Sequence, residues 1–201
     1  MKRMIPMALC LALCACGGTR VVDTTDKAEV AAMQHVMELE YRDWTNTAEK
    51  MTESMLQSNA LKTATKPVIA VGNIVNDTTQ RFDTDILTKK IRTTLLKSGT
   101  AQIATNFSGE DTTSNTVRNL RNNSEYDQNT IVKSGTLVAP NMSLSGKMLQ
   151  RNLKLESGWF SAVDTRVEYY LQLTLTDLKT GLSVWEDEQP IIKEGKDAPT
   201  W

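Results

Sequence analysis

Apolar and polar residues alternate most strictly in the last third of the chain. The odd positions carry Val163, Val167, Tyr169, Leu171, Leu173 and Leu175. The even positions carry Arg166, Glu168, Gln172, Thr174 and Thr176. A period of two is typical of a strand with one buried face. Further strands are predicted around 142–155 and, after a turn at 177–181, around 182–186, which together make an antiparallel meander.

The first half of the chain has helical spacing instead. From Asp26 to Asn59 apolar residues recur every three or four positions, at Val30, Met33, Met37, Tyr41, Trp44, Ala48, Met51 and Met55. This stripe predicts a helix. Asn46 and Glu49 have the spacing of a capping box, so we expect the helix to break and restart near residues 43–46.

A β-rich run and a second helical pattern follow. Residues 67–75 predict a buried strand, and 101–105 a short one. Between them, Asp83 can cap a helix that ends at Ser98-Gly99. A marginal helix is predicted over 109–123. The order of elements indicates an α+β fold, with a mixed β-sheet, a C-terminal antiparallel meander and flanking helices.

The N-terminus has the pattern of a secretory signal. Lys2 and Arg3 precede an apolar stretch from Ile5 to Ala15 that is too short to span a bilayer. Leu13-Cys14-Ala15-Cys16 resembles the bacterial lipobox, in which the signal is cut before the second cysteine and Cys16 receives lipid. A cut before Cys14 and an ordinary signal peptide with incidental cysteines are the alternatives. Gly17 in place of Asp implies, by the same resemblance, the outer membrane facing the periplasm.

The expected organisation follows from these segments. Residues 1–15 form the signal peptide, and 16–25 form the lipidated cysteine and a short tether. Residues 26–193 form one globular α/β domain with an N-terminal helix, and 194–201 form a frayed tail. No later stretch is long and apolar enough to span a membrane.

Composition narrows the range of functions. The chain has 201 residues, 23 Lys and Arg, 24 Asp and Glu, and a net charge of −1, which argues against a nucleic-acid-binding surface. His35 is the single histidine, and the three cysteines all fall within the first 16 residues. The body therefore lacks the residues for a Cys-His or Ser-His-Asp site, and we expect no enzyme activity, metal or cofactor.

Acidic pairs and one aromatic tip are the remaining candidates for function. Two acidic pairs have the residue type used in glycosidic chemistry, namely Asp83/Asp85 and Glu186/Glu188. Asp77 together with Asp83 and Asp85 could bind calcium. Helix capping and solvent-exposed strand edges explain these acidic residues better. Trp159-Phe160 lies between two predicted strands. Two interpretations stay open: the aromatic tip folds over the sheet edge, or it anchors a protein partner.

A basic strip of Arg151, Lys154 and Lys147 adjoins this tip. The candidate partner-binding residues are therefore Trp159, Phe160, Arg151 and Lys154. The terminal Trp201 is a weaker candidate of the same kind, because chain ends are usually disordered.

Five segments stand in the order found in one family of bacterial lipoproteins. They are Tyr41-Arg42-Asp43-Trp44 with Met51, Met55 and Leu56; Val68–Val75 with Asn76-Asp77-Thr78; Ile86-Leu87 and Ile91-Arg92-Thr93-Thr94-Leu95; Ser98-Gly99; and Thr180-Gly181-Leu182-Ser183-Val184-Trp185. With the lipobox in front, the chain resembles the LpoB family, outer-membrane lipoproteins that activate class A penicillin-binding proteins. The resemblance implies a fold related to the N-terminal part of TolB and to CsgG, no catalytic residues, and a class A penicillin-binding protein as partner.

Two features depart from the family pattern. Family members that span the periplasm have a long Pro-rich linker, whereas here Gly17–Thr25 reaches at most roughly 30 Å, and a helix over 26–43 would add about 27 Å. The segment 151–163 resembles an elongated hairpin that the family lacks.

A structural or assembly lipoprotein related to CsgG is the alternative function. A wall hydrolase that uses Asp83, Asp85 or Glu186 is a third.

Overall fold

The chain is described from a computed structural model that defines residues 21–33, 36–63, 65–107, 111–154 and 165–195. It divides into two compact units, Met1–Gln34 and His35–Trp201. The first unit contains the short helix α1 (Lys27–Ala31). The Asp26 carboxylate caps this helix by accepting the N–H of Ala28 at 2.8 Å.

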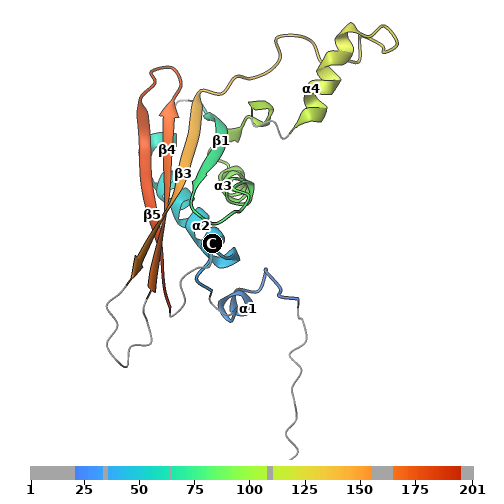
Figure 1. Cartoon of the computed structure of the whole chain (residues 1–201). Helices are drawn as coiled ribbons and strands as arrows, with labels where there is room; N and C mark the ends of the chain where they lie inside the picture. Colours follow the sequence, from blue (N-terminus) through green and yellow to red (C-terminus); the bar gives the residue numbers. More distant parts are fainter. Residues whose placement is uncertain (1–20, 34–35, 64, 108–110, 155–164, 196–201) are drawn as a thin grey trace, which may run out of the picture. The chain divides into compact units, whose positions relative to one another are not determined.

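A five-stranded mixed sheet forms the centre of the second unit (Figure 1). Its strands, in spatial order, are β2 (Gln102–Ile103), β1 (Val68–Asp77), β3 (Met142–Lys154), β4 (Thr165–Asp177) and β5 (Ser183–Gly195). β1 runs parallel to both of its neighbours, whereas β3, β4 and β5 pair antiparallel. The predicted α+β class, mixed sheet and C-terminal meander are confirmed.

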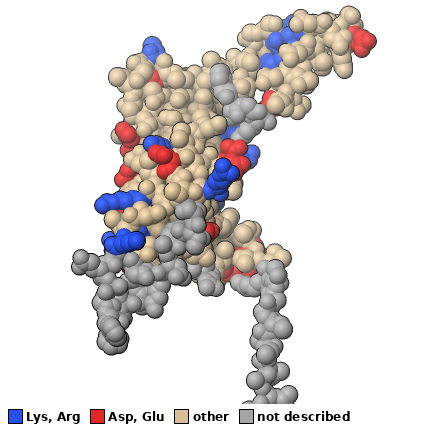
Figure 2. All heavy atoms as spheres, viewed as in Figure 1, with Lys and Arg blue, Asp and Glu red and all other residues tan. Residues whose placement is uncertain are grey.

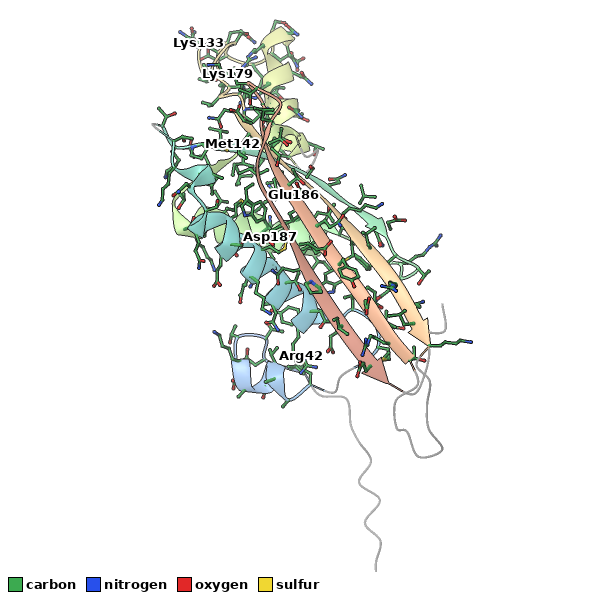
Figure 3. All side chains as sticks on the ribbon, turned by 90° about the vertical axis from the view of Figure 1, so that its left-hand side faces the viewer. Arg42, Lys133, Met142, Lys179, Glu186 and Asp187 are labelled. Carbon is green, nitrogen blue, oxygen red and sulfur yellow. The ribbon has the colours of Figure 1, made fainter. Side chains whose placement is uncertain are left out.

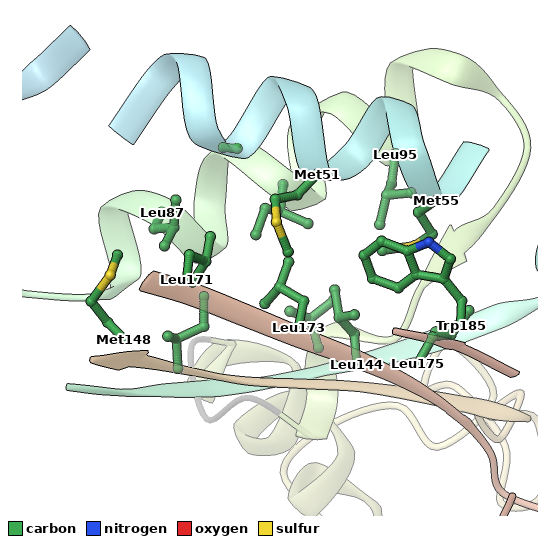
Figure 4. Packing of buried hydrophobic residues seen from close by; sticks show 14 of the residues in the cluster. Met51, Met55, Leu87, Leu95, Leu144, Met148, Leu171, Leu173, Leu175 and Trp185 are labelled. Carbon is green, nitrogen blue, oxygen red and sulfur yellow. The ribbon is translucent and has the colours of Figure 1, made fainter. Parts of the chain in front are cut away.

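Two helices, α2 (Tyr41–Gln57) and α3 (Asp85–Ser98), pack on one face of this sheet (Figures 1 and 4). They cover the odd-numbered residues of β4, of which Leu171 and Leu175 are 0% exposed, as the alternation predicts. Burying each such leucine contributes roughly 1.5–3 kcal/mol. Met51 and Met55 of α2 fill the layer between helix and sheet. The hydrophobic core thus lies on one side of the sheet.

The remaining elements are short. They are η1 (Asn59–Leu61), η2 (Thr105–Phe107), α4 (Thr112–Asn119) and η3 (Leu120–Asn122). Within the described ranges, no helix is both long and apolar enough to cross a membrane.

The predicted helix over 26–59 is wrong in its first half. α1 ends at Ala31 and α2 begins at Tyr41, so the interruption covers 32–40 and not 43–46. The capping box is formed by Glu40 and Asp43, because Asp43 Oδ2 accepts the N–H of Glu40 at 2.8 Å and the Glu40 side chain accepts the N–H of Asp43. Asn46 lies inside α2.

The other helix signals are confirmed, while the strand boundaries differ. Asp83 Oδ1 accepts the N–H of Asp85 at 2.9 Å at the start of α3, and Gly99 ends that helix with a φ of 68°. β1 is only partly buried, since Val75 is 58% exposed. β5 continues to Gly195, so the predicted strand end at 186 is wrong, and residues 194–195 of the predicted tail belong to the strand.

Candidate partner-binding surface

The face of β3, β4 and β5 turned away from α2 and α3 is not covered by either helix. We call it the open face. Side chains alternate along a strand, so the register with the buried residues of β4 assigns this face. It carries Lys147, Leu149, Arg151 and Leu153 from β3, Arg166, Glu168, Tyr170 and Gln172 from β4, and Glu188, Pro190, Ile192 and Glu194 from β5. Figure 3 shows the three strands side by side.

Polar pairs link neighbouring strands across the open face. Arg166 Nε donates to Glu194 Oε1 at 2.7 Å, and Gln172 Nε2 donates to Glu188 Oε2 at 2.7 Å. Lys147 Nζ lies 2.7 Å from an oxygen of Asp77 on β1. These pairs are exposed, and each contributes less than about 1 kcal/mol. The open face therefore carries charges of both signs among neutral side chains. Figure 2 shows positive and negative side chains interspersed in the same way on the face in view.

Glu168 is the exception among the even-numbered residues of β4, because it is only 7% exposed. The hydroxyl of Tyr170 donates to Glu168 Oε2 at 2.7 Å, and Arg151 Nη1 lies 3.8 Å from the same oxygen. The hydrogen bond to the carboxylate, followed by burial, raises the pKa of Tyr170. The phenol therefore stays protonated at neutral pH, and the hydrogen bond holds its ring on the sheet.

An apolar row crosses the open face among these charges. Leu149 pairs with Tyr170, and Tyr170 pairs with Pro190. Ile192 follows on β5 and is 56% exposed. Protein interfaces combine an apolar centre with a polar rim, and this row with its charged neighbours has that composition. The open face is therefore suited to contact with another protein.

A segment before α2 is bound to the end of β5 on the helix side of the sheet. We call residues 36–40 the strap. Lys193 Nζ donates to the carbonyl of Val36 at 2.9 Å and lies 2.6 Å from Asp43 Oδ2. The Tyr169 hydroxyl donates to the carbonyl of Met37 at 3.3 Å. Burial first, and then the charges of Glu38 and Asp43, raise the pKa of Tyr169 to about 12. The strap fixes the place at which the chain enters this unit.

The structure separates the residues that the sequence grouped as a basic strip. Lys147 and Arg151 lie on the open face, each close to a carboxylate. Lys154 follows Arg151 by three positions and therefore projects from the opposite face. Cys16, Trp159, Phe160 and Trp201 lie outside the described residues.

Sequence reasoning missed the contribution of β5. Glu188, Pro190 and Ile192 lie beyond the predicted strand end, where exposure alternates in the structure but apolar and polar residue types do not alternate in the sequence. Proline and a dense run of charge concealed the strand, because both are depleted in strands in general. Both are tolerated at a sheet edge, which is where β5 lies.

The acidic residues considered for catalysis lie on different elements. Asp83 and Asp85 lie at the start of α3, where the Asp83 carboxylate accepts the N–H of Asp85. Glu186 lies on β5. Among the residues with defined positions, no three His, Cys, Asp or Glu side chains form a group able to hold a metal ion.

Comparison with known proteins gives one family and several structures. The model of the family "Peptidoglycan-synthase activator LpoB" matches residues 43–191. The LpoB C-terminal domain from Escherichia coli is 14% identical, with 74% of this chain and 98% of that chain covered and a TM-score of 0.45. The corresponding Salmonella enterica domain is 15% identical, with coverages of 74% and 98% and a TM-score of 0.45. Lipoprotein GNA1162 from Neisseria meningitidis is 9% identical, with coverages of 67% and 88% and a TM-score of 0.35. No curated protein matches.

Proposed function

Since the chain belongs to the LpoB family of peptidoglycan-synthase activators, we propose that it binds and activates a class A penicillin-binding protein while anchored in the outer membrane. The match of the family model over residues 43–191 carries this proposal. That range includes all of the sheet except the end of β5.

The anchor is proposed from the sequence at the N-terminus. Leu13-Cys14-Ala15-Cys16 supports lipidation of Cys16, and Gly17 supports sorting to the outer membrane. The predicted helix over 26–43 would have made the tether stiff, but of the described residues 21–33 only Lys27–Ala31 are helical. The residues between Cys16 and the strap give the tether about the same maximum reach as was predicted. Together with α1 they span at most roughly 55 Å.

The open face supplies a surface for the partner. Its apolar row can be buried against another protein, while the surrounding charged side chains remain at the rim. Activation requires that the domain bind the active conformation of the synthase more tightly than the inactive one. A ligand with equal affinity for both conformations does not change the equilibrium between them. The proposed mechanism is therefore binding alone, with no chemistry by this chain.

The test compares two isoleucines of nearly equal exposure. Ile192 on the open face is 56% exposed, and Ile86 on α3 is 57% exposed. We expect Ile192→Glu to weaken binding to a class A synthase at least about ten-fold, because it places a charge in the centre of an interface. Ile86→Glu, the matched control, should change the affinity less than two-fold. Glycan polymerisation by the purified synthase should fall in parallel with binding.

Two results would count against this proposal. Equal effects of the two glutamates would remove the open face as the docking surface. If the unmodified chain neither binds nor stimulates any class A synthase of the same cell, synthase activation itself would be excluded, and the structural or assembly role would take its place.

The aromatic tip is proposed as an additional contact. Trp159 and Phe160 follow β3, whose Arg151 lies on the open face and whose Lys154 lies on the other. Capture of the synthase by the Trp159→Ala chain should be weaker than capture by the unmodified chain. Unchanged capture would remove the tip from the interface and leave the open face untouched.

A further inference from the structure

The edge of the sheet opposite β5 carries a pocket of about 320 Å³. Its walls come from the start of β1, from β2 and η2, from α4, and from residues 137–138. Among the described residues that line it, Arg118 of α4 is the one ionisable side chain. The described walls of the pocket therefore carry a positive charge and no negative charge.

The backbone of β2 offers free hydrogen-bonding groups beside this pocket. Gln102 donates its N–H to the carbonyl of Pro67 at 2.9 Å, and Ala104 donates to that of Ile69 at 2.9 Å. Because these alternate residues point toward β1, the intervening Ile103 turns its N–H and carbonyl away from the sheet. Within the described part of the chain, β2 pairs with β1 alone. An added strand would find this edge open.

Arg118 lacks an acceptor. Its Nε is shielded from solvent and has no hydrogen-bond partner. Throughout the described residues its guanidinium takes part in no ion pair. A shielded donor without an acceptor is unfavourable, and a carboxylate forms strong charge-assisted hydrogen bonds with a guanidinium. Leu137 and Val138, which are 50% and 68% exposed, add apolar contact area to the wall of the pocket.

We propose that this pocket binds an extended peptide segment of a protein partner. The segment would add as a strand along Ile103 and place a carboxylate on Arg118. Strand addition satisfies the backbone groups of the edge, and the charge on Arg118 selects an acidic peptide over a neutral one. This site lies at the opposite edge of the sheet from β5, so it is independent of the proposed activation of a synthase.

The test uses the full chain and a defined probe. The pentapeptide acetyl-Val-Thr-Val-Thr-Val is titrated with a free C-terminal carboxylate and, separately, as the C-terminal amide. Amide and guanidinium NMR signals report binding. We expect saturable shifts at Ile103 and Arg118 with the carboxylate form, and at least five-fold weaker binding of the amide form. Arg118→Gln should lower the affinity for the carboxylate to that for the amide. Lys133→Gln, which removes one positive charge in the following loop, should leave it unchanged.

A second variant tests strand addition. Ile103→Pro removes the outward N–H and leaves the bonds of Gln102 and Ala104 to β1 in place, so it should abolish binding of both peptides. Ile103→Val should retain it. Equal affinity for carboxylate and amide forms, shifts reproduced by acetate alone, or no shifts at all would each overturn the proposal. If Ile103→Pro does not fold, the comparison of acid and amide and the Arg118→Gln variant still decide.

Discussion

Gly146 lies where β3 approaches β4 on the core side of the sheet. A Cβ at this position would lie 2.6 Å from the carbonyl oxygen of Gln172 and would also collide with the Leu173 side chain. The backbone oxygen cannot move away without breaking the β3–β4 ladder. Glycine is therefore required at this position by close packing between strands.

We expect Gly146→Ala to lower the free energy of unfolding by about 2 kcal/mol, in the range found for overpacked cores. Gly72→Ala is the matched control. Its Cβ would meet its nearest atom, the carbonyl oxygen of Leu144, at 3.4 Å. Urea unfolding of both variants measures the difference. Equal loss of stability would show that the β3–β4 contact is not the cause.

Tyr169 links stability to alkaline pH. Its ring is fully buried, and burial with the charges of Glu38 and Asp43 raises its pKa from 10.0 to about 12. The folded state thus keeps the proton after the unfolded chain has lost it. The contribution is complete below pH 10 and is lost as the pH rises through about 12, at roughly 1.4 kcal/mol per pH unit.

Tyr169→Phe should therefore unfold with a flatter pH dependence between pH 10 and 12 than the unmodified chain. Stability at neutral pH should fall by about 1 kcal/mol, through loss of the hydrogen bond to Met37. Tyr126→Phe, at a tyrosine that is 48% exposed, should leave the pH dependence unchanged. An unaltered slope for Tyr169→Phe would contradict the raised pKa.

The burial of single residues could be predicted from the sequence where it depends only on the alternation within one strand or helix. The period of two identified the buried residues of β4. Glu168 escaped this reasoning, since its burial depends on Arg151 and Tyr170 around it on the sheet. The register between β3 and β4 brings Arg151 opposite Glu168, and no pattern within one strand reports that pairing.

The strap shows the same limit at the scale of elements. Met33, Met37 and Tyr41 have helical spacing, yet the described residues between Ala31 and Tyr41 belong to no helix. Lys193, more than 150 positions away, binds the backbone of this segment and pairs with Asp43. A tertiary contact thus overrides a local period. α3, whose first N–H is bound by Asp83 and whose end is set by Gly99, was predicted closely.

Lys193→Met should release the strap. The Lys193 side chain is only 9% exposed and faces Asp43 and Glu40 as well as the strap carbonyls. Removing the cation leaves Asp43 without its ion-pair partner in a shielded place, while Glu40 keeps Arg42 at 2.8 Å, and this is expected to cost about 3 kcal/mol of unfolding free energy. Lys179→Met, in the exposed turn between β4 and β5, should cost less than about 0.5 kcal/mol.

Hydrogen exchange distinguishes release of the strap from general loss of stability. In the Lys193→Met chain, amides of residues 36–40 and of the first turn of α2 should lose protection, while those of β3 should not. Uniform loss of protection in all elements would contradict a local role for Lys193. Unchanged stability would show that the attraction between Lys193 and Asp43 is offset by the cost of removing both charges from water.

At the scale of the whole molecule, the proposals give separate tasks to separate regions: peptide binding to the β2 edge, synthase binding to the open face, and anchoring to the N-terminal lipobox. The sheet class could be predicted from the sequence because it depends on local patterns, and the anchor, which also depends on a local pattern, stays a prediction. The sequence did not predict the edges, since which strand ends outermost follows from the order β2-β1-β3-β4-β5, which no single segment encodes. If the tasks are separate, removal of the anchor should leave binding by the sheet intact.

Substitution of the three cysteines one at a time tests this separation. Cys16→Ala should abolish incorporation of labelled palmitate and shift the protein out of the outer-membrane fraction, because a single unlipidated chain lacks the acyl groups that hold it there. Cys10→Ala and Cys14→Ala should keep both properties, since alanine before Cys16 preserves the small residues of the lipobox. Loss of palmitate from Cys14→Ala alone would instead assign the lipid to Cys14. Purified Cys16→Ala protein should still bind the synthase with unchanged affinity, because the open face is built entirely from β3, β4 and β5.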